Sequence, residues 1–131
     1  MAHDNNRPRH RFSSKLGWAL RGVAWGMRTE ANFKIHLAAV LAVVIAAVLL
    51  RATLIEWCVL VVCIAVVLAA ELFNTALEHL ARAVTREPNE EVRNALDSSA
   101  GAVLLAASGA AIAGAAVFVN RLGVWLAWWG G

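Results

Sequence analysis

The sequence predicts an all-α membrane protein, built from an N-terminal amphipathic surface helix and three transmembrane helices. Of its 131 residues 60% are hydrophobic and 16% are charged, whereas a soluble domain is nearer half apolar and a quarter charged. Three runs, residues 37–50, 57–70 and 98–119, contain no charged side chain. A soluble core of this length could not bury so much apolar surface. An ordinary soluble domain is therefore excluded, and the runs are expected to cross a membrane.

The N-terminal part divides into a polar basic tail, residues 1–11, and a surface helix over about residues 12–31. Apolar residues recur in this second segment at helical spacing, with basic residues between them. A basic amphipathic helix beside a span is expected to lie in the interfacial plane, a depth that suits Trp18 and Trp25. A helix that only packs on the bundle is the alternative.

The three spans are expected at about residues 33–50, 57–81 and 98–119, inside one membrane domain that covers residues 12–122. Pro88 and Asn89 break the helix in a charged loop over residues 82–97. Asp97, Ser98 and Ser99 are predicted to cap the third span, whose many Ala and Gly residues favour close helix packing. Residues 123–131 form a tail rich in Trp and Gly.

The distribution of Lys and Arg predicts that the N-terminus is cytoplasmic. Seven of these residues lie in residues 1–35 and three in the charged loop, against Arg51 and Arg121 on the opposite side. Such an excess marks the cytoplasmic face of a membrane protein. A basic tail can also bind nucleic acid, but no nucleic-acid motif accompanies it, so no such partner is expected.

A polar stripe interrupts the second span. Glu71, Asn74, Thr75 and Glu78 are spaced i, i+3, i+4 and i+7, which places them within an arc of roughly 100° on one helix face. Placing each carboxylate at membrane depth costs at least about 2–3 kcal/mol of insertion free energy, so two carboxylates on one stripe indicate a structural or functional role. Measured from Trp57 at the outer interface, Glu78 lies roughly 32 Å away, at the inner surface, and Glu71 roughly 21 Å away, within the lipid.

This difference in depth suits a reaction between a water-borne and a lipid-borne reactant. Glu78 can hold a hydrated cation such as Mg²⁺, Glu71 can accept a proton from a lipid hydroxyl, and Asn74 can orient either reactant. The alternative is an interhelical polar network that fixes the register of an oligomer.

Three segments resemble the prokaryotic diacylglycerol kinase family, which includes undecaprenol kinases: RTEANFKIH at 28–36, AELFNTALE at 70–78 and ALDSSAGAVLLAA at 95–107. The resemblance covers about residues 11–120. It implies a homotrimer with active sites shared between subunits, in which each subunit has a surface helix and three spans. It also implies a bacterial inner-membrane enzyme that uses Mg²⁺ and ATP to phosphorylate a lipid alcohol, diacylglycerol or undecaprenol, on the cytoplasmic side.

Matched position by position, the resemblance implies that Glu71 is the general base with Asn74 beside it, and that Glu30 and Glu78 bind the metal. The positions that it implies for contact with the nucleotide are Arg11, Glu87, Pro88, Asn89 and Asp97.

Two positions depart from the family pattern. Leu96 replaces a lysine that touches ATP phosphates, and Arg82 replaces an acidic residue one turn after Glu78. Arg82 lies about 20° from Glu71 around the helix axis, so it could supply the missing positive charge to the nucleotide. It could equally pair with Glu78 and block the metal.

The leading hypothesis is therefore a lipid kinase. A catalytically degenerate member that binds lipid or nucleotide without turnover is one alternative, because of Leu96 and Arg82. A small proton-coupled transporter is another, because of the carboxylates within the membrane. His36 is interpreted as an interfacial residue at the inner mouth of the first span, and a role near the nucleotide is the alternative.

Overall fold

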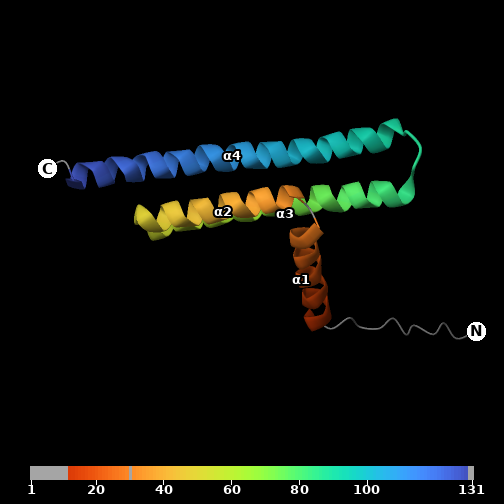
Figure 1. The fold of residues 1–131 in the computed structure, drawn as a ribbon, viewed down its shortest axis with the longest axis horizontal. Helices are drawn as coiled ribbons and strands as arrows, with labels where there is room; N and C mark the ends of the chain where they lie inside the picture. The colour runs from red at the N-terminus through yellow and green to blue at the C-terminus, as the bar shows by residue number, and fades with distance from the viewer. Residues whose placement is uncertain (1–11, 30, 130–131) are drawn as a thin grey trace, which may run out of the picture.

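The computed structural model describes residues 12–29 and 31–129, and within these ranges the only regular structure is helical. The helices are α1 (Phe12–Thr29), α2 (Ala31–Leu49), α3 (Leu54–Val84) and α4 (Glu90–Trp129). Figure 1 shows α2, α3 and α4 running side by side, with α1 crosswise to them. α4 packs mainly on α3, and α2 also packs on α3. The predicted all-α class is confirmed.

Two of the predicted spans have the length and apolar composition to cross a membrane: α3, and the segment Glu90–Ala127 of α4. The apolar stretch of α2, Phe33–Leu49, is shorter, so a third span stays a prediction. α3 has 31 residues and α4 has 40, whereas about 20 suffice to cross the hydrocarbon core. Both helices therefore extend beyond the hydrocarbon of a bilayer that they cross.

The turn between α2 and α3 ends the first apolar helix abruptly. Ala52 N–H donates to the carbonyl of Ala47 and Arg51 N–H to that of Val48, the two bonds of a Schellman motif. Arg51 takes the left-handed position with φ 53°, where glycine is usual. The chain thus turns back at once into α3.

The start of α3 is tied to α4. Thr53 and Glu56 form a capping box, which satisfies free backbone N–H groups of the first turn. The same Glu56 carboxylate accepts a hydrogen bond from Arg121 Nε of α4 at 2.6 Å, and Asn120 also donates to it. Because charge-assisted bonds of this kind are short and directional, they fix the register between α3 and α4 at this end.

The other end of α4 differs from the prediction. The helix begins at Glu90, after Asn89, whose Oδ1 accepts from Val92 N–H at 3.1 Å. Asp97, Ser98 and Ser99 therefore lie inside the helix, and the prediction that they cap it is wrong. Asn89 caps the first turn, and the charged segment that follows it contains no Gly or Pro. This segment is therefore helical and extends α4 beyond its apolar part.

α1 is anchored on α3. Gly26 is buried, and a Cβ atom built on it would lie 2.7 Å from Leu72 Cδ2, so α1 approaches α3 closely at this point. The neighbouring Trp25 ring meets His79 edge-on, with ring centroids 4.6 Å apart. α1 is therefore held beside the polar stripe of α3.

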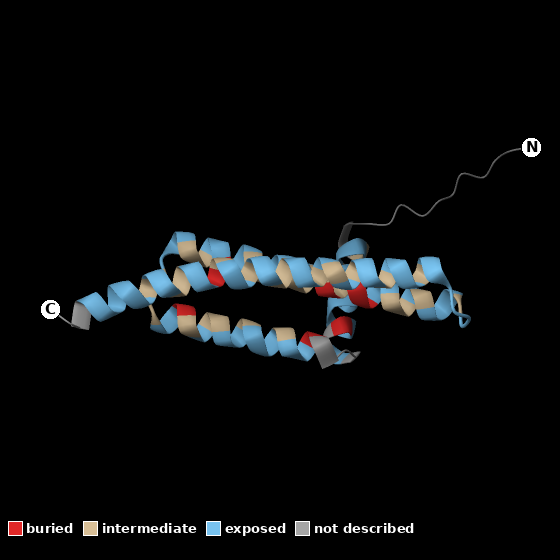
Figure 2. Cartoon of the chain, turned by 90° about the horizontal axis from the view of Figure 1, so that it is seen from above, coloured by how far each residue is buried: buried red, intermediate tan, exposed pale blue. Residues whose placement is uncertain are grey.

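Few residues are buried, as Figure 2 shows. Apolar side chains are exposed along α2, α3 and α4, where lipid or other subunits would cover them. The buried set includes three polar side chains of one helix, Glu71, Asn74 and Thr75. The fold thus covers the stripe that would be costly to expose to hydrocarbon.

Candidate functional site

The predicted stripe on α3 is brought together and covered by neighbouring helices. Glu71 and Thr75 are each 3% exposed and Asn74 is 8% exposed, whereas Glu78, one to two turns further on, is only partly buried. The single chain already buries most of the stripe, so covering it does not by itself require an oligomer. The gradient of exposure from Glu71 to Glu78 is the one that the sequence predicts.

Glu71 meets a residue of another helix. His36 Nε2 of α2 lies 3.6 Å from Glu71 Oε2, which is within ion-pair range and longer than a hydrogen bond. The sequence indicates an interfacial position for His36 and gives no sign of a contact with Glu71. Only the packing of α2 on α3 brings the two together.

Asn74 links the stripe to α4. Its Nδ2 donates to Glu78 Oε1 at 2.9 Å, and its Oδ1 lies 2.7 Å from the Ser99 hydroxyl, which donates to it. The Ser99 hydroxyl also lies 2.9 Å from the Leu96 carbonyl, and its single proton can serve only one acceptor at a time. The sequence predicts only a capping role for Ser99, and the contact with Asn74 does not follow from it.

We expect Ser99→Ala to lower the kinase activity proposed below about fivefold to tenfold, because the loss of a partner for the Asn74 amide costs about 1 kcal/mol or slightly more. Ser98→Ala is the matched control, because the Ser98 hydroxyl donates to the Asn94 carbonyl of its own helix. Turnover rates of the two purified variants check this. Equal rates in both would contradict a role for Ser99 in holding Asn74.

A hollow of about 510 Å³ lies between the end of α3, the connecting residues and the start of α4, a size typical of small-molecule sites. It brings together several of the positions singled out from the sequence. Its lining comprises Glu78, Ala81, Arg82, Thr85, Arg86, Glu87, Pro88, Val92 and Leu96. Two other predicted nucleotide contacts are not part of that lining: Asn89, which caps α4, and Asp97, which is exposed.

Arg82 contacts Glu78 at the rim of this hollow. Its Nη2 lies 3.5 Å from Glu78 Oε2, and its Nε donates to the Glu78 carbonyl at 3.2 Å. The two side chains are 62% and 41% exposed, and exposed pairs of this kind are worth at most about 1 kcal/mol. The pairing, one of the two alternatives that the sequence leaves open for Arg82, is present. Because it is weak, a phosphate or a cation could readily replace either partner.

Glu78 fits a Mg²⁺ ligand by its chemistry. The carboxylate is partly open to the hollow, and Mg²⁺ commonly takes one or two carboxylates together with substrate phosphates. In the parts of the chain that the structure describes, no three His, Cys, Asp or Glu side chains form a metal cluster. Two predicted site residues, Arg11 and Glu30, lie outside the described residues.

Comparison with known proteins supplies the family context. The profile of the family "Prokaryotic diacylglycerol kinase" matches residues 17–118. An undecaprenol kinase of Bacillus subtilis is 34% identical over 119 residues, which cover 91% of this chain and 97% of that protein. A diacylglycerol kinase of Synechocystis is 38% identical over 111 residues, covering 84% of this chain and 62% of that protein, so the match spans less than two thirds of it. No solved structure matches.

Proposed function

Because the chain belongs to the prokaryotic diacylglycerol kinase family, and is thus a membrane lipid kinase of the diacylglycerol or undecaprenol kinase type, we propose that it transfers the γ-phosphoryl group of ATP to the hydroxyl of a lipid alcohol at the cytoplasmic face. One observation carries this proposal. The buried Glu71 and the partly exposed Glu78 lie on one helix face, Asn74 between them donates a hydrogen bond to Glu78, and Glu78 lines an open hollow.

In the proposed reaction the lipid enters from the membrane side and ATP from the hollow. Glu71 takes the proton of the lipid hydroxyl, whose oxygen attacks the γ-phosphorus. The bond from that phosphorus to the β–γ bridging oxygen breaks, and ADP leaves with the electron pair. Asn74 keeps Glu78 oriented through its 2.9 Å hydrogen bond. Such a reaction depends mainly on positioning and charge neutralisation.

Glu30 and Glu78 would hold Mg²⁺ in this proposal, and the bound ion would neutralise charge on the phosphates. At the hollow, the Arg82 guanidinium offers positive charge and several N–H donors to the same phosphates. Glu87 and Pro88 support this placement of the nucleotide because both line the hollow. Arg11, Asn89 and Asp97 are proposed as nucleotide contacts on the family resemblance alone.

The experiment that tests the function is incubation of the purified protein with Mg²⁺ and γ-labelled ATP, in mixed micelles that contain diacylglycerol or undecaprenol. A labelled lipid is expected, and its chromatographic mobility identifies the acceptor. ATP binding without a labelled product would favour the degenerate alternative. Proton flux in vesicles without a labelled product would favour the transporter.

We expect Glu30→Gln and Glu78→Gln to raise the Mg²⁺ concentration needed for half-maximal activity, because each amide binds a hard cation more weakly than a carboxylate does. Magnesium titrations of lipid phosphorylation check this. Glu91→Gln, an exposed change in the first turn of α4, is the control and should leave the titration unchanged. Parental titrations in both test variants would contradict the metal assignment.

The proposed enzyme is a homotrimer in the bacterial inner membrane, with its N-terminus cytoplasmic. The excess of Lys and Arg in residues 1–35 and in the segment 82–97 supports this orientation, because such residues concentrate on the cytoplasmic face. The trimer rests mainly on the family resemblance. Glycines on α4 also support it, because added Cβ atoms at Gly101 and Gly109, neither of which is buried, would meet nothing within 4 Å, leaving room for close approach by another helix.

A further inference from the structure

His36 occupies an unusual place in the fold. It belongs to α2, yet its imidazole Nε2 lies 3.6 Å from Oε2 of Glu71 on α3. The side chain of Glu71 is 4% exposed and that of His36 is 24% exposed. The imidazole thus contacts a nearly buried carboxylate while part of its surface stays open.

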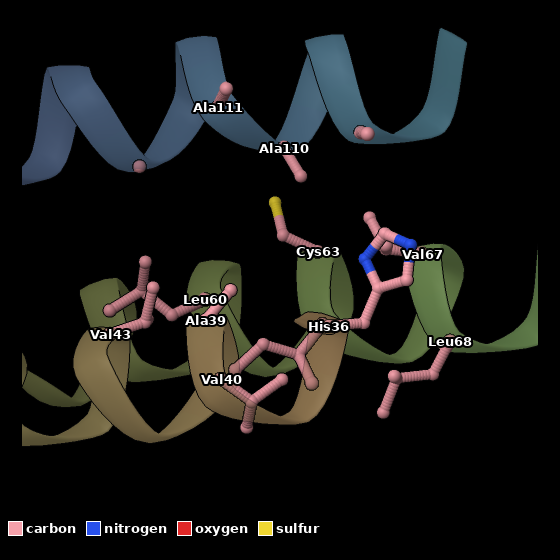
Figure 3. Close-up of a pocket in the computed structure, with 13 residues that line it drawn as sticks. His36, Ala39, Val40, Val43, Leu60, Cys63, Val67, Leu68, Ala110 and Ala111 are labelled. Carbon is pink, nitrogen blue, oxygen red and sulfur yellow. The ribbon is translucent and has the colours of Figure 1, made fainter. Parts of the chain in front are cut away.

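The open side of His36 faces an apolar groove of about 280 Å³ between α2, α3 and α4. The other lining side chains are aliphatic, apart from Cys63 and Gly114. Figure 3 shows the His36 ring standing away from α2 at one end of this groove, beside Val67 of α3. Glu71 follows Val67 by four residues, and so lies one turn further along the same helix.

A base must present a lone pair in a defined direction before it can take a proton. A glutamate side chain on a helix can rotate its carboxylate, and one contact to a single oxygen restricts that rotation. In surroundings of low polarity such a contact is stronger than it is in water. To become a hydrogen bond, the contact needs a proton on Nε2, which the corresponding neutral tautomer and the imidazolium both carry. It also needs a closer approach than the present 3.6 Å, as when long catalytic contacts tighten once substrate is bound.

We propose that His36 is a positioning residue for phosphoryl transfer: its imidazole holds Oε2 of Glu71, so that Oε1 is left to accept the proton of the lipid hydroxyl. The inference rests on the proposed role of Glu71 as the base. His36 does not itself touch the reacting atoms in this arrangement. It acts through the carboxylate, so its loss should reduce kcat rather than weaken ATP binding.

The test compares two substitutions in the full-length protein in lipid micelles. His36→Leu removes the donor, and we expect kcat to fall on the order of tenfold to a hundredfold, with the KM for Mg-ATP unchanged. His36→Gln retains an N–H donor on a side chain of similar reach, so it should recover most of the lost kcat. Leu37→Ala, at the next position of α2, controls for disturbance of that helix and should keep the parental kcat.

Thermal unfolding and size-exclusion profiles accompany the kinetics, because a purely structural role would change these and would not be rescued by glutamine. If the leucine variant does not fold, His36→Phe keeps a ring without the donor. Full kcat in the donor-free variant, or equal loss in the glutamine variant, would overturn the inference. Loss of activity in Glu71→Gln together with full activity in His36→Leu would overturn the role of His36 alone. Activity in Glu71→Gln would remove the proposed base itself.

Discussion

Glu71→Gln is expected to abolish lipid phosphorylation and to leave the protein folded. The amide has almost the shape of the carboxylate, so it can occupy the same nearly closed site, where Glu71 is 3% exposed. It cannot accept the proton of the lipid hydroxyl at a useful rate. A positioned general base contributes on the order of 10²–10⁴ in rate, so residual turnover should lie near the detection limit of the labelled-ATP assay.

Glu71→Asp provides the comparison within the same site. It keeps the carboxylate and withdraws it by one methylene group, so we expect its turnover to lie between those of the parent and the glutamine variant. Thermal unfolding of all three proteins verifies that folding is not the cause of the loss. Parental turnover in the pure glutamine variant would dispose of the role of Glu71 as a base.

The stripe on α3 could be predicted from the sequence because its geometry is local. Four positions spaced at helical intervals share a face whenever the segment is helical, and burial of the stripe follows from the cost of exposing it to hydrocarbon. The contact between Arg82 and Glu78 was foreseeable for the same reason, since residues four apart on a helix are neighbours. For these features the helix period was sufficient information.

Contacts between helices could not be obtained in this way. His36 meets Glu71, and Ser99 meets Asn74, only because of the register in which α2 and α4 pack on α3. Neither register is set by the period of one helix. The predicted cap at Asp97 to Ser99 failed for a different, local reason: two plausible helix starts compete in that segment, and Asn89 caps the earlier one. Leu96, the position where the family resemblance leads one to expect a lysine, does line the hollow.

Arg82→Ala is expected to depress lipid phosphorylation strongly, on the order of a hundredfold, because it removes the positive charge that replaces the missing lysine. Loss of one well-placed donor to developing charge costs about 3 kcal/mol or slightly more. Arg82 and Leu96 line the same hollow from α3 and α4, so a lysine at position 96 could approach the same phosphates. Leu96→Lys in the Arg82→Ala background should therefore restore part of the activity.

The competing outcome follows from the contact between Arg82 and Glu78 at 3.5 Å. If this pair excluded the metal, Arg82→Ala would raise Mg²⁺ affinity and would not reduce turnover. The exposure of both side chains favours compensation, because a pair worth at most about 1 kcal/mol yields readily to a divalent cation and a polyphosphate. Arg93→Ala, which removes an exposed arginine of α4 whose contact with Glu90 is 4.0 Å long, is the control for lost surface charge. Undiminished phosphorylation by Arg82→Ala would eliminate compensation and leave the leucine at position 96 without a substitute for the family's lysine.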